Sequence, residues 1–221
     1  MSTRIALIHA VTVAVAPVEA ALRELWSEAE CVNILDDSLS VDRERDGRLT
    51  AAMTWRIIAL AEYGRSAGAD AILFTCSAFG GAIEAAAARL PIPVLKPNEA
   101  MFEAALKAGR RIGMLATFAP SVASMEDEFR QMAAAYGSPA TIESHCVPGA
   151  MAALKAGDAV THDELVAAAA RRFADYDAVL LAHFSTSRAA PAAGTALGRP
   201  VLTSPGSAVA KLKSVVAVQQ Y

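Results

Sequence analysis

The feature that most constrains the fold of this chain is an internal repeat. Shifting the sequence by 107 residues superimposes three separate stretches without a gap. Residues 4–8 (RIALI) fall on 111–115 (RIGML), residues 70–73 (DAIL) on 177–180 (DAVL), and residues 93–95 (PVL) on 200–202 (PVL). Two copies and a short tail fill the 221 residues. We therefore expect a first lobe of residues 1–97 plus about 206–221, and a second lobe of residues 98–205.

Each copy alternates short apolar runs with longer helical stretches. The apolar runs lack polar alternation, which is typical of strands buried on both faces; they cover residues 5–10, 71–75 and 93–95, and then 112–116, 178–182 and 200–202. The predicted helices include residues 17–29, 50–66, 121–135 and 162–174. Thr161 and Glu164 have the spacing of a capping box at the start of the last one. This alternation predicts an α/β fold with parallel sheets and helices on both faces.

The composition excludes several classes of function. A hydrophobic content of 54% supports a well-buried core, and a net charge of −3 gives no basic surface for nucleic acid or membrane. Three scattered cysteines are too few for a disulfide framework or a zinc site, so we expect a reducing cytoplasm. No motif for nucleotides, metalloprotease zinc or a serine nucleophile is present, so we expect no cofactor and no metal.

The N-terminus imitates a secretion signal, because Arg4 precedes an apolar stretch that runs to Val15. His9 and Thr12 interrupt that stretch, and residues 111–117 repeat its beginning inside the chain. The segment is therefore predicted to be the first strand. No window reaches the length of about 18 apolar residues that a membrane span needs.

Ligands of parallel α/β folds bind outside the carboxyl ends of the strands, so a cleft between the two copies is the expected site. Cys76 follows the strand at residues 71–75, and a helix begins near Gly80. Helical N–H groups there are expected to lower the thiol pKa, although a free cysteine is also a common core residue. His183 holds the same position in the second copy. A pseudo-two-fold axis would bring both groups to one cleft; the alternative is a structural histidine.

Other polar residues form a second group of candidates. His9 ends the first strand, and Thr117 ends its counterpart, where it could donate a hydrogen bond to a carboxylate. Ser121 is interpreted as a helix N-cap. The remaining residues are read as structural or solvated: Cys31 and Cys146 as structural, His145 and His162 as loop or helix-start residues, residues 42–46 (DRERD) as a solvated loop whose arginine could reach an anion, and Phe79, Phe118 and Phe184 as pocket wall or core.

Three stretches, residues 68–77 (GADAILFTCS), 111–117 (RIGMLAT) and 177–183 (DAVLLAH), resemble the aspartate/glutamate/hydantoin racemase superfamily in order and spacing. That group also contains maleate isomerase and arylmalonate decarboxylase, and the resemblance covers essentially the whole chain. It implies two pseudo-symmetric flavodoxin-like lobes, an active site in the cleft between them, no cofactor, a small carboxylate substrate and a homodimer.

The resemblance also implies roles for particular residues. Racemases of this group place two cysteines on opposite sides of the substrate α-carbon. Cys76 matches the first cysteine, whereas the second position holds His183. Thr117 matches a carboxylate-binding threonine, and Ser77 stands where the group often has asparagine.

The sequence leaves three hypotheses. The first is a cofactor-independent racemase or isomerase that transfers a proton at the α-carbon of a small carboxylate, with Cys76 and His183 as opposed acid and base. Its predicted substrate-binding residues are His9, Thr75, Ser77, Thr117, Phe184 and Ser185. The second is a decarboxylase, or a lyase, isomerase or hydrolase with Cys76 as nucleophile. The third is a non-catalytic ligand-binding relative. The identity of the substrate stays open.

Overall fold

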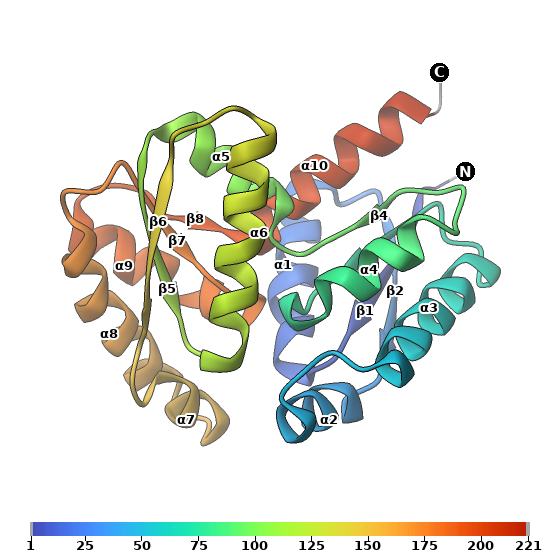
Figure 1. The fold of residues 1–221 in the computed structure, drawn as a ribbon, viewed down its shortest axis with the longest axis horizontal. Helices are drawn as coiled ribbons and strands as arrows, with labels where there is room; N and C mark the ends of the chain where they lie inside the picture. The colour runs from blue at the N-terminus through green and yellow to red at the C-terminus, as the bar shows by residue number, and fades with distance from the viewer. Residues whose placement is uncertain (1, 220–221) are drawn as a thin grey trace. The chain divides into compact units, whose positions relative to one another are not determined.

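The computed structural model describes residues 2–219, which divide into two compact units. Unit 1 comprises Met1–Glu99 and Pro205–Tyr221, and unit 2 comprises Ala100–Ser204. Each unit contains one four-stranded parallel sheet flanked by helices; Figure 1 shows the strands of unit 1 in blue to green and those of unit 2 in yellow-green to red-orange. The predicted α/β class with two lobes of one architecture is confirmed.

The strands and the helices between them follow one order in both units, apart from η4 of unit 2, and each unit has one further helix at an end of this series. Unit 1 holds β1 (Arg4–His9), η1 (Thr12–Ala14), α1 (Val15–Leu25), β2 (Glu30–Leu35), α2 (Ser38–Asp46), α3 (Ala51–Ser66), β3 (Ala71–Phe74), η2 (Ser77–Phe79), α4 (Gly80–Ala87), β4 (Val94–Leu95) and α10 (Ser204–Gln219). Unit 2 holds α5 (Glu99–Ala108), β5 (Arg111–Ala116), η3 (Ala119–Ser121), α6 (Val122–Ala135), β6 (Thr141–Cys146), α7 (Ala150–Lys155), α8 (Ala159–Ala170), η4 (Arg171–Phe173), β7 (Ala178–Leu181), η5 (Phe184–Ala189), α9 (Ala190–Leu197) and β8 (Leu202–Thr203).

The two sheets share one strand order and the register of their central strands. The orders are β2-β1-β3-β4 and β6-β5-β7-β8. Ile5 pairs with Ala71 in unit 1, and Ile112 pairs with Ala178 in unit 2, so the central pairing is preserved at the 107-residue shift. β1 and β3, like β5 and β7, therefore end at the same edge of their sheet.

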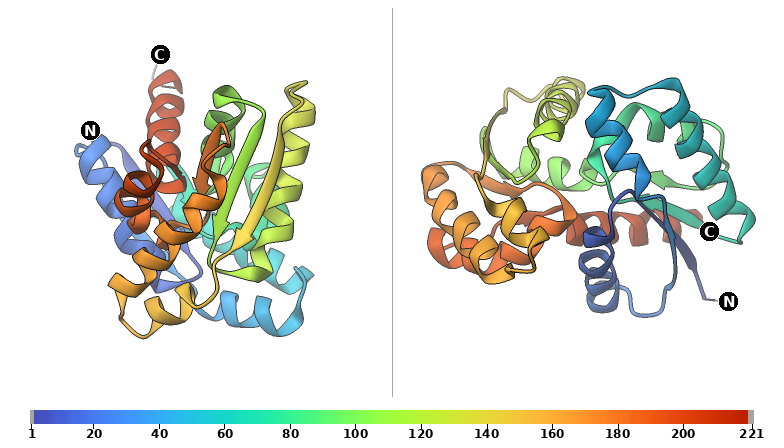
Figure 2. Two further views of the ribbon diagram at one scale, coloured as in Figure 1. Left: turned by 90° about the vertical axis from the view of Figure 1, so that its left-hand side faces the viewer. Right: turned by 90° about the horizontal axis from the view of Figure 1, so that it is seen from below.

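Helices cover both faces of each sheet because the central strands are apolar on both sides. In unit 1, α3 and α4 pack on one face of β1 and β3, and α1 lies on the other (Figure 2). In unit 2, α5 and α6 cover one face, and α7, α8 and α9 cover the other. The first strand of each unit has a parallel neighbour on each side, and the connections to parallel neighbours are right-handed. Connections that run to opposite sides of a strand place their helices on opposite faces of the sheet.

The edge strands β2 and β6 were missed by the sequence analysis. The predicted helix over residues 17–29 ends earlier, at Leu25, and β2 begins at Glu30. Both strands are half exposed, so they lack the apolar run that marks the central strands. Their relation along the chain is also not 107 residues, because Arg4 pairs with Glu30 whereas Arg111 pairs with Thr141. An ungapped repeat cannot align them.

Two local predictions are wrong. Residues 42–46 are not a solvated loop but the end of α2, where Arg56 of α3 binds Asp36 at 3.0 Å through Nε and Asp42 at 2.6 Å through Nη1. The helix after residue 158 is capped by Asp158, whose side chain accepts a hydrogen bond from the Thr161 N–H at 3.0 Å. Thr161 therefore lies inside α8, and the predicted capping box with Glu164 does not form.

One close strand–helix contact in each unit uses a small residue, but on different elements. In unit 1, Ala6 of β1 approaches Gly64 of α3, where an added Cβ would lie 3.0 Å from the Ala6 Cβ. In unit 2, the small residue is on the strand, and a Cβ on Gly113 would lie 2.4 Å from Cγ of Phe173. Phe173 is fully buried, so its ring has no room to move away. Among residues 2–219, no helix is both long and apolar enough to cross a membrane.

Substituting Gly113→Ala should destabilise the protein by about 1–3 kcal/mol, because the new methyl group overlaps a buried ring. The matched control is Gly81→Ala in α4, where the nearest atom to an added Cβ is 4.0 Å away. This control should be neutral or stabilising by roughly 0.5–1 kcal/mol, as alanine is the better helix former. Urea unfolding gives the free energy of unfolding of each variant. Equal values for Gly113→Ala and Gly81→Ala would contradict the close packing of Gly113 against Phe173.

Candidate active site

The carboxyl ends of β1 and β3 bring three of the predicted site residues of unit 1 together. Thr75 and Cys76 follow β3, and His9 is the last residue of β1. The Nδ1 atom of His9 lies 2.9 Å from Oγ1 of Thr75. Cys76 has ordinary extended backbone angles, with φ −120° and ψ 122°.

A chain of hydrogen bonds runs from Thr75 to the surface of unit 1. Nδ2 of Asn33 donates to Glu19, so Oδ1 of Asn33 faces Nε2 of His9, at 2.9 Å. Nε2 of His9 then carries the proton, and Nδ1 accepts the hydroxyl proton of Thr75 in preference to the more distant carbonyl oxygen of Ile8, at 3.3 Å. Burial lowers the pKa of His9, which favours this neutral form. Both ring nitrogens of His9 are engaged, so His9 serves to orient Thr75, the residue before Cys76.

The expected low pKa of Cys76 is not observed. Burial of the thiol raises its pKa, and this effect outweighs the hydrogen bond from Ala78 and the charge of Arg43, which act in the opposite direction. Arg43 extends from α2, and its Nε donates to the carbonyl oxygen of Ala78 at 3.3 Å. Cys76 is therefore a thiol at neutral pH, with its proton available for transfer.

His183 occupies the corresponding position in unit 2, directly after Ala182 and β7. Its φ of 71° makes it the one residue other than glycine with a positive φ in the described part of the chain. Its Nε2 lies 2.6 Å from Oγ of Ser121, and its ring packs edge-on against Phe118. Burial lowers the pKa of His183 to about 4, so the imidazole is neutral at pH 7.

Two residues of this edge have partners that the sequence did not predict. Thr117 follows β5, and its Oγ1 lies 3.0 Å from Oγ1 of Thr186 in η5. The predicted N-cap role of Ser121 is wrong, because Ser121 ends η3 with a helical backbone and η3 continues directly into α6; its side chain contacts His183. Ser, Thr and Asn side chains have common local roles in caps and turns, so these long-range contacts leave no signal in the sequence.

The other candidates divide between the site loops and the core. Ser77 lies in η2, and Phe184 and Ser185 begin η5. These three residues are buried. Phe79 packs in the core cluster of unit 1 and is not a pocket wall. Among the residues read as structural, Cys31 lies in β2, and His162 lies in the first turn of α8, where it is buried and bonded to Asp163. His145 lies in β6 and not in a loop, and Cys146 ends β6, where it pairs with Ala116 beside Thr117.

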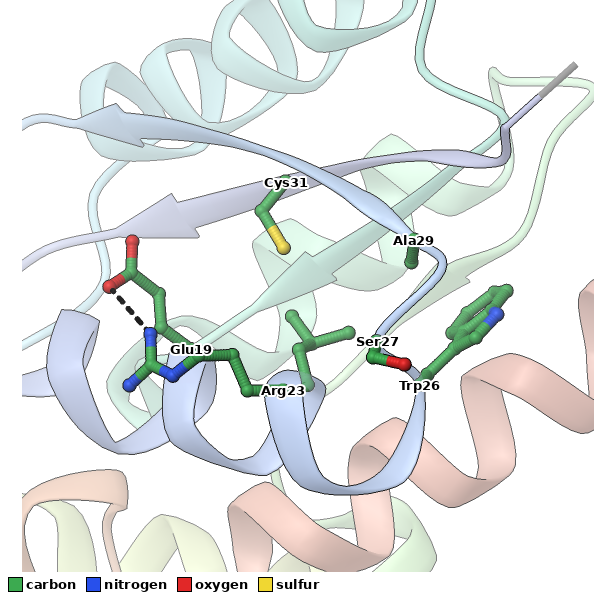
Figure 3. A pocket seen from close by; sticks show the side chains of 7 residues that line it. Glu19, Arg23, Trp26, Ser27, Ala29 and Cys31 are labelled. Carbon is green, nitrogen blue, oxygen red and sulfur yellow. Dashed lines mark ion pairs between the residues drawn. The ribbon is translucent and has the colours of Figure 1, made fainter.

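A cavity of about 200 Å³ lies between α1 and the beginning of β2 in unit 1 (Figure 3). It is lined by Glu19, Leu22, Arg23, Trp26, Ser27, Ala29 and Cys31. Cys31 pairs with Ile5 near the amino end of β1, so this cavity lies away from the strand ends that carry Cys76. Within residues 2–219, no three His, Cys, Asp or Glu side chains cluster as metal ligands would.

A family model for Asp/Glu/hydantoin racemases matches residues 11–212. The chain belongs to the Asp/Glu/hydantoin racemase family. Cys76 and His183 both lie within the matched range, after corresponding strands of the two units. No curated protein matches the sequence closely enough to count as a relative.

Solved structures of this racemase family and its neighbours share the fold. Allantoin racemase from Klebsiella pneumoniae is 20% identical, with a TM-score of 0.74 over 99% of this chain and 89% of its own. Glutamate racemase from Francisella tularensis, solved with D-glutamate, is 15% identical, with a TM-score of 0.74 over 99% and 82%. A cysteine-substituted mutant of arylmalonate decarboxylase is 17% identical, with a TM-score of 0.67 over 97% and 93%.

The backbone of His183 leads to a stability prediction. Replacing His183 with glycine should give a more stable protein than replacing it with alanine, by about 1 kcal/mol or more, because only glycine tolerates a positive φ without strain. Position 76 is the matched control: its φ is ordinary, so Cys76→Gly should be less stable than Cys76→Ala by roughly 0.4–1 kcal/mol. Chemical denaturation gives the order within each pair, and the same order at both positions would refute a strained His183.

Proposed function

We propose that this racemase-family protein is a cofactor-independent racemase or isomerase that transfers a proton at the α-carbon of a small carboxylate, with Cys76 and His183 as opposed acid and base. One observation carries the proposal. The two residues hold equivalent positions after β3 and β7, and burial gives them complementary protonation states, a raised pKa for the thiol and a pKa of about 4 for the imidazole. One group holds a proton at neutral pH, and the other is ready to accept one.

The proton transfer follows from these states. In the resting enzyme, neutral His183 removes the α-proton from one face of the substrate, and the Cys76 thiol donates its proton to the other face. The product has inverted configuration, and the enzyme holds an imidazolium and a thiolate. The reverse transfer starts from that charged pair. The proposal requires that the strand ends of both units meet the same substrate.

Removal of an α-proton leaves negative charge on the carboxylate, so hydrogen-bond donors must stabilise an enolate-like intermediate. We assign this role to the hydroxyl of Thr117 and to backbone N–H groups where η2 and η5 begin, at Ser77 and Phe184. The hydroxyls of Ser77 and Ser185 are further donors in those turns. Thr75, held by His9, positions the Cys76 loop.

The relatives support a small carboxylate or a similar carbon acid as substrate. Their printed names include allantoin, glutamate and aspartate racemases, and one was solved with D-glutamate. Each of these substrates has an acidic hydrogen on a carbon next to a carbonyl group. The same proton transfer would act on all of them, so the pocket and not the acid–base pair decides among them.

A decarboxylase is the second candidate, and the protonation of Cys76 is the observation that favours it. Loss of carbon dioxide leaves a carbanion that needs one proton donor, which the Cys76 thiol supplies without a second thiol. Arylmalonate decarboxylase shares the fold. In that reaction, His183 would contact the substrate without removing a proton.

The proposed function predicts solvent deuterium incorporation at the α-carbon of at least one substrate. We would incubate the protein in heavy water with allantoin, aspartate, glutamate, hydantoins and arylmalonates, and follow loss of the α-proton by NMR. The substitutions Cys76→Ser and His183→Gln should each lower the exchange rate by about 10²–10⁴-fold, the usual contribution of a general acid or base.

Cys31→Ser is the matched control, because it makes the same chemical change in a half-buried cysteine of the same unit. Its exchange rate should stay within about twofold of the native rate. Release of carbon dioxide without exchange of an α-proton would favour the decarboxylase. Ligand-induced thermal stabilisation with neither reaction would indicate a non-catalytic binding protein.

A further inference from the structure

His183 has one bonded ring nitrogen and one nitrogen without a partner. Its Nε2 lies 2.6 Å from Oγ of Ser121, which is 1% exposed. Its Nδ1 is buried and has no hydrogen-bond partner among residues 2–219. A buried polar atom without a partner is costly, and such atoms in native proteins often serve function. Nδ1 is therefore the ring nitrogen of His183 that is available to a bound ligand.

The hydroxyl of Ser121 decides which nitrogen of His183 carries the proton. Ser121 has one hydroxyl proton, and the carbonyl oxygen of Phe118 lies within hydrogen-bond reach, 3.0 Å from its Oγ. The contact with Nε2 of His183 is shorter, at 2.6 Å, and by distance alone fits either direction of donation. If the hydroxyl donated to Nε2, Nδ1 would be a buried N–H group without an acceptor, which is rarer in proteins than a buried acceptor without a donor, so we assign the ring proton to Nε2. A neutral imidazole has a single N–H group. Nδ1 is therefore left with its lone pair.

We propose that Ser121 is a positioning residue that holds His183 in the Nε2–H tautomer, so that Nδ1 is the atom that exchanges a proton with the substrate. The inference rests on the proposed function for its chemical use. In the step, the α-C–H bond breaks, an Nδ1–H bond forms, and the electron pair stays on the substrate as the enolate. The Nε2–H bond to Ser121 is kept throughout, so no second proton has to move.

The backbone of His183 supports a functional reading of this contact. His183 keeps a positive φ although a glycine would relieve the strain. Strained backbone of this kind persists where the surrounding structure holds it, and it is common at functional sites.

The test combines nitrogen NMR of the His183 ring with kinetics. In the native protein at pH 7, the ring should be the Nε2–H tautomer, whose two nitrogens have well-separated ¹⁵N shifts. Ser121→Ala should shift the ring towards a mixture of tautomers and lower the rate constant for α-proton exchange by about 10–100-fold, with little change in KM. Ser121→Thr, which keeps the hydroxyl, should restore the native tautomer and most of the rate.

Ser124→Ala is the matched control, since Ser124 lies one turn further along α6 and bonds only to the backbone oxygen of Ser121. It should change neither the ring signals nor the rate. An Nδ1–H tautomer in the native protein, or unchanged ring signals in a folded Ser121→Ala variant, would overturn the inference. If the tautomer changes as expected while no substrate exchanges its proton, the proposed function fails and the positioning role of Ser121 stands.

Discussion

The structure depends on the complete burial of its central strands, β1 and β3 in unit 1 and β5 and β7 in unit 2. Each is covered on both faces by helices, so its backbone hydrogen bonds and apolar side chains leave no room for function along its length. Chemistry is confined to the point where the chain leaves the sheet. Cys76 lies just after β3, and His183 lies just after β7. The two residues hold equivalent positions because the pairing of the central strands is the same in both units.

The two equivalent positions have diverged in backbone as well as in side chain. Cys76 has extended angles and is backed by the hydrogen-bonded chain through Thr75, His9 and Asn33. His183 has a positive φ and is held by Ser121. Burial then acts on the two groups in opposite senses, because it disfavours both the thiolate and the imidazolium. At neutral pH, burial therefore leaves Cys76 as a thiol and His183 as a neutral imidazole.

The sequence predicted the parts of the fold that rest on strong, local patterns. The central strands are continuous apolar runs, and their repetition at one spacing identified both lobes and the positions of Cys76 and His183. β2 and β6 were missed because edge strands such as ECVNIL mix polar and apolar residues, and because their spacing differs between the copies. α2 was missed because it is short and mostly charged, and because the partner of Asp42 is Arg56, a residue of the next helix. The direction of the Cys76 pKa and the Ser121–His183 contact depend on three-dimensional packing, which a linear pattern does not contain.

The central claim is that Cys76 and His183 act on one substrate, and chemical cross-linking tests it most directly. A His183→Cys variant, made in a protein with Cys31→Ser and Cys146→Ser, would be treated with a three-carbon reagent that alkylates two thiols. Our account predicts a single intramolecular product joining the peptides of positions 76 and 183, and its formation should slow when a substrate of the native protein is bound. Separate alkylation of the two thiols, with no linked peptide at any reagent concentration, would contradict a shared site.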